Sequence, residues 1–187
     1  MIEYIASRLS AYLVKMEIIR EDEQDVYQYG FDITIYTITS TIGLLLIGIV
    51  FGQLKNALFM ISALYLLQTY GGGYHASTHF RCFGLMALGL AAGLLLQLCS
   101  IPDSVLAVVW VFSTATLLCI PLVLHPNKSY LSGQVKLYSI RSRLVTVLVL
   151  LISLTLLHFN ILSLACITVG FAMPTLSRIV AWMKRDF

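Results

Sequence analysis

Six apolar runs fill this chain of 187 residues from residue 33 onward. Most of them approach the roughly 20 apolar residues that a helix needs to cross a lipid bilayer. The predicted spans are 33–52, 54–70, 83–100, 104–124, 144–159 and 161–177. The last two meet near His158, where the chain forms either two spans or one kinked hairpin. We therefore predict an all-α polytopic membrane protein with about six transmembrane helices, in a single domain over residues 1–187.

The composition excludes most other classes of protein. Only 11% of the residues are charged and 59% are apolar, and the mean hydropathy is +0.89. An ordinary soluble domain has about 25% charged residues, so this chain lacks the polar surface that such a domain needs. The same numbers exclude a disordered chain and a secreted disulfide scaffold. A net charge of +3 is too small to indicate a nucleic-acid partner.

The positions of the basic residues predict the orientation in the membrane. If the N-terminus is cytoplasmic, every one of the 12 Lys and Arg residues except Lys55 falls on the cytoplasmic side. Cytoplasmic loops of membrane proteins carry such an excess of Lys and Arg. We therefore expect cytoplasmic N- and C-termini, with segments 71–82 and 125–143 on the same face.

Residues 1–32 precede the first span and carry an amphipathic pattern. Ile2, Ile5, Leu9 and Leu13 recur at helical spacing, with charged residues beside them. The pattern predicts a helix in the cytoplasmic interface of the membrane, in contact with lipid. Such a helix is either an anchor or lid for the bundle, or a surface that docks a peptide.

The segment 71–82, which reads GGGYHASTHFRC, departs from the apolar pattern. Gly71 to Gly73 end the second span and permit backbone conformations that other residues avoid. His75, His79, Arg81 and Cys82 then follow at the start of the third span. Ionisable residues at the edge of a membrane are costly, so this segment is the candidate functional site.

Cys82 is the candidate nucleophile of this segment. The N-terminus of the third span and the adjacent Arg81 both favour a thiolate, and an imidazole can serve as its base. His79 is one helical turn away, whereas His75 would lie about 10 Å away on a straight helix. Spacing alone favours His79, and His75 requires a bend. The alternative is that Cys82 only packs, as we expect of Cys99, Cys119 and Cys166.

A metal site is the alternative chemistry for the same residues. His75, His79 and Cys82 have ligand spacing that suits zinc. However, the sequence offers no clear fourth ligand, and we expect neither a metal nor another cofactor.

The sequence around this segment resembles the accessory gene regulator B (AgrB) family, the membrane cysteine endopeptidases of Gram-positive quorum sensing. The matching residues are GGYHA at 72–76 and RCF at 81–83. Further similarity lies at Tyr29-Gly30 and at HPNK, residues 125–128.

The resemblance implies a role for each matching residue. Cys82 would be the nucleophile and His75 the general base and acid, in place of the His79 that spacing favours. Lys128 would belong to a substrate-contacting loop. The supporting residues would be Gly72, Gly73, His79, Arg81 and Gln68. Gln68 departs from the family, which often has an arginine there.

The resemblance also implies a substrate and a location. The enzyme would cleave the C-terminal tail of an AgrD-like propeptide through a cysteine thioester and promote cyclisation to a thiolactone or lactone signal. It would act as a homodimer in the bacterial cell membrane. Gly84, Gly89 and Gly93 offer a surface between two copies, unless they pack within one chain. The alternative function is a small transporter of a peptide or lipid, in which the His/Cys segment is structural.

Overall fold

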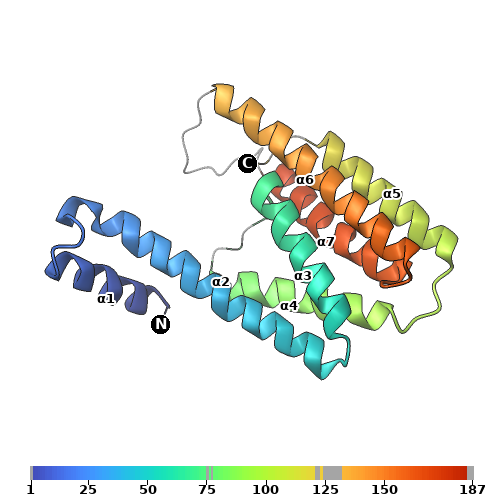
Figure 1. The fold of residues 1–187 in the computed structure, drawn as a ribbon, viewed down its shortest axis with the longest axis horizontal. Coiled ribbons are helices and arrows are strands. Elements are labelled where there is room, and N and C mark those ends of the chain that lie inside the picture. Colours follow the sequence, from blue (N-terminus) through green and yellow to red (C-terminus); the bar gives the residue numbers. More distant parts are fainter. Residues whose placement is uncertain (1, 75, 77, 121–122, 124–131, 185–187) are drawn as a thin grey trace. The chain divides into compact units, whose positions relative to one another are not determined.

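The computed structural model describes residues 2–74, 76, 78–120, 123 and 132–184 (Figure 1). Within these residues the regular structure is helical and contains no strand, so the predicted all-α class is confirmed. Two predicted site residues, His75 and Lys128, lie outside the described residues.

Helices occupy all six predicted span positions, and another lies near the N-terminus. Their bounds are α1 (Ile2–Lys15), the short 3-10 helix η1 (Glu21–Glu23), α2 (Gln24–Val50), α3 (Leu54–Gly71), α4 (His79–Leu96), α5 (Asp103–Cys119), α6 (Ser132–His158) and α7 (Leu164–Met183). The chain turns at Asn160, where φ is +53°, and α6 and α7 are separate helices on either side of this turn. The choice between two spans and one kinked hairpin stays open.

Two of the helices begin well before the predicted spans that they contain. α2 begins at Gln24 rather than at residue 33, and α6 begins at Ser132 rather than at residue 144. Hydropathy locates the apolar part of a helix, but polar residues continue the same backbone hydrogen bonding beyond it.

In the part of the chain that the structure describes, four helical segments are long and apolar enough to cross a membrane, which identifies a membrane protein. They are Glu21–Val50, His79–Leu96, Gly133–His158 and Leu164–Met183. The apolar helix α5 is shorter, at 17 residues. The count of six spans therefore stays a prediction.

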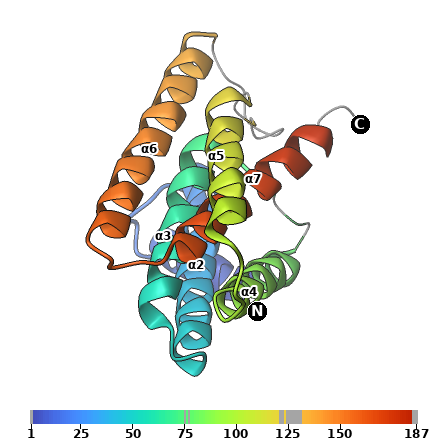
Figure 2. The same ribbon diagram turned by 90° about the vertical axis from the view of Figure 1, so that its right-hand side faces the viewer.

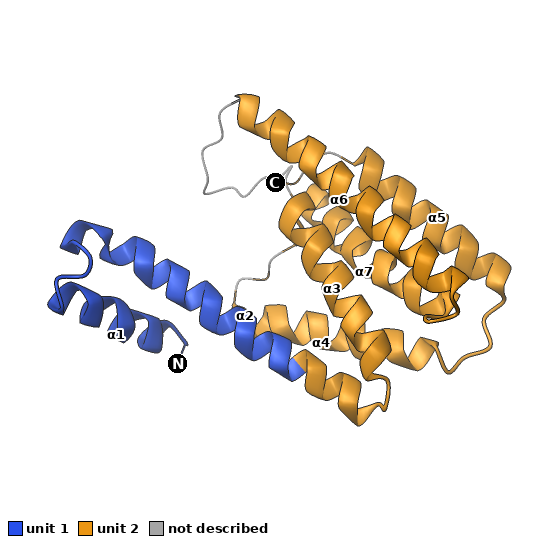
Figure 3. Ribbon diagram, in the orientation of Figure 1, with its two compact units in different colours: residues 1–43 blue, residues 44–187 orange. Residues whose placement is uncertain are grey.

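Two compact units make up the chain, residues 1–43 and residues 44–187 (Figure 3). In the first unit, α1 is helical as the amphipathic pattern predicts. Its Ala6 is buried, whereas Tyr4, Ile5 and Leu9 are exposed. Its location in the membrane interface stays a prediction.

In the second unit, α7 packs against α3, α4 and α5, while α6 packs against α3 and α5 (Figure 2). The core of this unit gathers around Phe171 of α7, with Leu67 of α3, Leu90 of α4 and Leu117 of α5. α7 is thus the helix around which the unit is built.

Side-chain hydrogen bonds between α7 and α5 show that these two helices are parallel. The hydroxyl of Thr168 donates to the carbonyl of Leu106 at 3.2 Å, and that of Thr175 to the carbonyl of Ser113 at 3.2 Å. Small hydroxyl side chains bridge apolar helices in this way where water is absent.

α3 runs in the same direction. Near the start of α7, the thiol of Cys166 lies 3.7 Å from the carbonyl of Asn56. Near its end, Arg178 bonds the carbonyl of Leu67 at 3.2 Å. The C-terminal ends of α3, α5 and α7 therefore meet at one end of the unit.

α4 runs antiparallel to α7, and its glycines mediate the contact. A Cβ on Gly89 would lie 2.8 Å from Met173, and one on Gly93 would lie 2.5 Å from Val169. At these two positions the alternative that the glycines pack within one chain is confirmed, because both close approaches are made within the chain. Gly84 faces open space. The homodimer itself stays a prediction.

Candidate functional site

The backbone between α3 and α4 leaves the helical conformation at the glycine run. α3 ends at Gly71, and the N–H of Gly72 donates to the carbonyl of Gln68 at 2.8 Å. Gly72 has a φ of +71°, which a residue with a side chain rarely adopts. The next helix begins at His79. The predicted break before the third span is therefore confirmed at the described positions.

Each glycine of residues 71–73 also lies too close to another part of the unit to carry a side chain. A Cβ on Gly71 would overlap the guanidinium of Arg178, and one on Gly72 would overlap the carbonyl of Val123. A Cβ on Gly73 would lie 2.7 Å from Oγ of Ser177. The glycine run is thus needed for close packing as well as for its backbone angles.

Tyr74 fastens the end of this segment to α7. Its backbone N–H donates to Oγ of Ser177 at 2.9 Å and to the Ser177 carbonyl at 3.1 Å. Its hydroxyl accepts from Nζ of Lys184 at 3.3 Å, and that ammonium lies 4.3 Å from the centroid of the Tyr74 ring. Tyr74 immediately precedes the predicted base, His75.

Cys82 lies in the first turn of α4, as the sequence predicts. Thr78 caps the helix, since its hydroxyl accepts from the Arg81 N–H at 3.3 Å and its carbonyl from the Cys82 N–H at 3.0 Å. The Cys82 thiol is reduced and half-buried. The positive end of the helix dipole favours the thiolate form of a cysteine at this position.

The other cysteines differ in their surroundings. Cys166 is buried in the core, as predicted. Cys99 and Cys119 are exposed, so their predicted role as packing residues is wrong. Both lie at helix ends, since Cys99 follows α4 and Cys119 is the last residue of α5.

His79 begins α4, one turn before Cys82, so the spacing that favours it as the base is real. The separation expected for His75 on a straight helix does not apply, because the described residues from Gly72 to Thr78 are not helical. The choice between the two histidines stays a prediction, as does the role of Lys128. The His75–His79–Cys82 metal alternative is equally untested.

Gln68 contacts the glycine segment. Its carbonyl accepts from Gly72, and its Cγ lies 3.2 Å from the position that a Cβ on Gly73 would take. The Gln68 side chain therefore packs against the glycine segment.

Ser177, Arg178 and Lys184, all from the C-terminal part of α7 or just beyond it, were not candidates in the sequence. The sequence offered one signal for them, because Arg178 is an arginine directly after an apolar run. α7 continues past residue 177, so Arg178 lies inside the helix with 1% of its surface exposed. A charged residue at such a position indicates a specific role.

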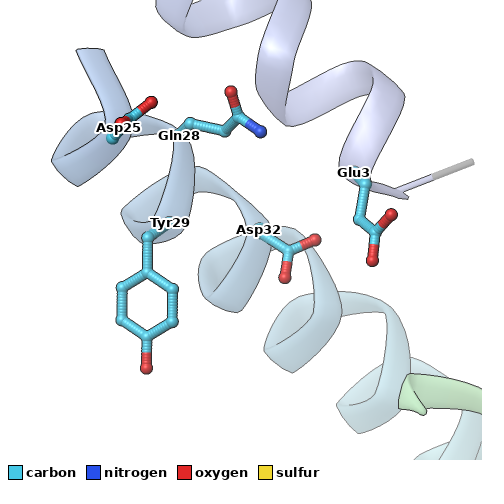
Figure 4. Close-up of a pocket in the computed structure, with 5 residues that line it drawn as sticks. All are labelled: Glu3, Asp25, Gln28, Tyr29 and Asp32. Carbon is cyan, nitrogen blue, oxygen red and sulfur yellow. The ribbon is translucent and has the colours of Figure 1, made fainter. Parts of the chain in front are cut away.

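The first unit contains a separate cleft of about 340 Å³ (Figure 4). It is lined by Glu3, Asp25, Gln28, Tyr29 and Asp32. No cysteine or histidine is among the described residues that line this cleft.

Comparison with known protein families identifies a match that spans most of the chain. The family model for Accessory gene regulator B matches residues 6–178, which include the glycine run, Cys82 and Arg178. No curated protein and no solved structure matches the chain. The match extends from the first turns of α1 to the last turns of α7, and so covers nearly all of the helices.

Proposed function

Because the chain belongs to the accessory gene regulator B family, we propose that it is a membrane-embedded cysteine endopeptidase acting on an AgrD-like propeptide. The family processes such propeptides in quorum sensing. The enzyme removes the C-terminal tail of the propeptide and promotes cyclisation of the remaining signal sequence to a thiolactone or lactone. The bacterial cell membrane is its proposed location.

The observation that carries the proposal is the position of Cys82. The half-buried thiol lies in the capped first turn of α4, directly after a segment whose glycines pack against α7. A nucleophilic cysteine needs a stabilised thiolate and a base on a defined backbone. The N-terminus of α4 stabilises the thiolate, and His75 is our candidate for the base.

The reaction proceeds in two acyl transfers. The Cys82 thiolate attacks the scissile carbonyl carbon, and the resulting tetrahedral species expels the amine of the tail. Protonated His75 donates its proton to that amine, which leaves a thioester between Cys82 and the N-terminal part of the propeptide. A thiol or hydroxyl of the bound peptide then loses its proton to His75 and attacks the thioester. This closes the ring and releases Cys82.

Backbone N–H groups stabilise the oxyanion in such reactions. Thr78 already accepts from the N–H groups of Arg81 and Cys82. The oxyanion donors are therefore to be sought among the residues that precede Arg81. Exclusion of water from the thioester favours cyclisation over hydrolysis.

Substitution of Cys82 tests the proposal. Purified protein in lipid nanodiscs is incubated with a synthetic AgrD-type propeptide, and release of the tail is measured. We expect Cys82→Ala to abolish release and Cys99→Ala, at an exposed cysteine outside the site, to leave it unchanged. Tail release that persists in Cys82→Ala would exclude Cys82 as the nucleophile. It would leave the metal or transporter alternatives to be tested by chelation and by transport assays.

A further inference from the structure

Arg178 of α7 is a buried cation that contacts three other helices beside the glycine run. Its Nη1 donates to the carbonyl of Leu117 in α5 at 2.7 Å, and its Nη2 donates to the carbonyl of Leu67 in α3 at 3.2 Å. The same Nη2 lies 3.4 Å from Oγ of Ser142 in α6. Among the described residues, no carboxylate forms an ion pair with it. Backbone oxygens therefore compensate its charge.

The two carbonyls suit a cation because both lie in the last turns of their helices, at the negative ends of the helix dipoles. Leu117 has a further reason to accept from Arg178. The residue four positions later is Pro121, which has no N–H to donate in a helix. Away from water, such a carbonyl needs another donor. Arg178 thus satisfies a group that α5 cannot satisfy by itself.

Arg178 and its neighbour Ser177 hold the glycine segment from two sides. The guanidinium occupies the space where a side chain on Gly71 would lie. Ser177 contacts Gly73 and accepts from the Tyr74 N–H through both its hydroxyl and its carbonyl. Two consecutive residues of α7 therefore fix both ends of the run 71–74.

We propose that Ser177 and Arg178 are positioning residues that hold residues 71–74 against α7, and so place the segment that leads to His75 and Cys82. This inference rests on the proposed function for its effect on the reaction. A run of three glycines has more backbone freedom than any other three residues. Its conformation must therefore be imposed by contacts with the rest of the unit. Displacement of a reacting group by about 1 Å can cost on the order of 100-fold in rate.

A suppressor pair tests the contact between Ser177 and the glycine run. A Cβ on Gly73 would lie 2.7 Å from Oγ of Ser177. We expect Gly73→Ala to lower kcat for tail release by about 100-fold while KM changes by less than about twofold. Ser177→Ala keeps the hydrogen bond from the Tyr74 N–H to the backbone carbonyl of residue 177, so we expect a small effect on kcat. In Gly73→Ala/Ser177→Ala the obstructing oxygen is gone, and we expect at least about tenfold of the lost kcat to return.

Arg178→Lys tests the bridge between the helices. Lysine keeps the charge, but its single ammonium does not reproduce the planar fork that reaches two carbonyls. The matched control is Thr168→Val, which removes a different α7–α5 hydrogen bond, to Leu106, away from the glycine run. We expect Arg178→Lys to lower kcat by at least about tenfold and Thr168→Val by less than about twofold, with KM unchanged in both.

Hydrogen exchange makes the test independent of catalysis. We expect faster exchange of the Tyr74 amide in Arg178→Lys than in the unsubstituted protein, and no change there in Thr168→Val. Equal exchange and equal kcat in all three proteins, together with no recovery in the suppressor pair, would overturn the positioning role. The proposed function is judged separately, since it fails only if the unsubstituted protein forms no Cys82 thioester.

Discussion

At the scale of single residues, the proposed mechanism depends on how His75 and Cys82 are placed. The sequence identifies Cys82 and the break before it, because an ionisable run after glycines stands out from apolar spans. Ser177 and Arg178 could not be identified in this way, since they meet the glycine run about 100 residues away along the chain. Contacts of this kind leave no periodic pattern in a single sequence.

The two histidines provide a prediction at this scale. We expect His75→Ala to reduce propeptide cleavage by about 10²- to 10⁴-fold, the range for loss of a general base. His79→Ala should retain substantial activity, although His79 lies one turn from Cys82 on α4. The measurement is single-turnover cleavage with matched enzyme concentrations. A severe loss in His79→Ala with a mild loss in His75→Ala would assign the base to His79.

At the scale of the helix, hydropathy predicts where helices occur better than where they end. The six predicted spans correspond to α2 to α7, yet α6 begins at Ser132 and α7 continues beyond residue 177 to Met183. The prediction ended the last span just before Arg178 because a charge normally terminates an apolar run. Here the carbonyls of Leu67 and Leu117 satisfy that charge inside the bundle. The helix therefore continues through it.

The cap of α4 gives a prediction at the same scale. Thr78→Ala removes the hydroxyl that accepts from the Arg81 N–H, so the first turn, which carries Cys82, becomes less stable by about 1 kcal/mol. Thr78→Ser keeps an accepting hydroxyl and serves as the control. We expect slower propeptide cleavage in the alanine variant alone, measured beside the midpoint of thermal unfolding in detergent. Equal rates in both variants would show that the cap does not support the nucleophile.

At the scale of the whole molecule, the parallel course of α3, α5 and α7 places their C-terminal ends together. The start of α4, with Cys82, lies at this end as well, because α4 is antiparallel to α7. This agrees with the alternation of spans in the sequence prediction. The periodicity of a sequence does not show which helices pack against each other. The central position of α7 is therefore seen only in the packed structure.

Reporter fusions test the orientation. The distribution of Lys and Arg predicts that the site and both termini face the cytoplasm. Fusions after Lys55 and after Asp103 should report an external position, and a fusion after Phe187 an internal one. An external C-terminus would contradict an even number of spans, and the helices α6 and α7 would then need reassignment.

The central claim is that Cys82 forms a covalent acyl-enzyme, and intact-mass spectrometry after incubation with propeptide tests it most directly. We predict an adduct whose mass equals the enzyme plus the whole propeptide minus the released tail. The adduct should be cleaved by hydroxylamine and mapped to Cys82 in the first turn of α4. Cleaved tail without any such adduct under single-turnover conditions, or an adduct that persists in Cys82→Ala, would contradict the account.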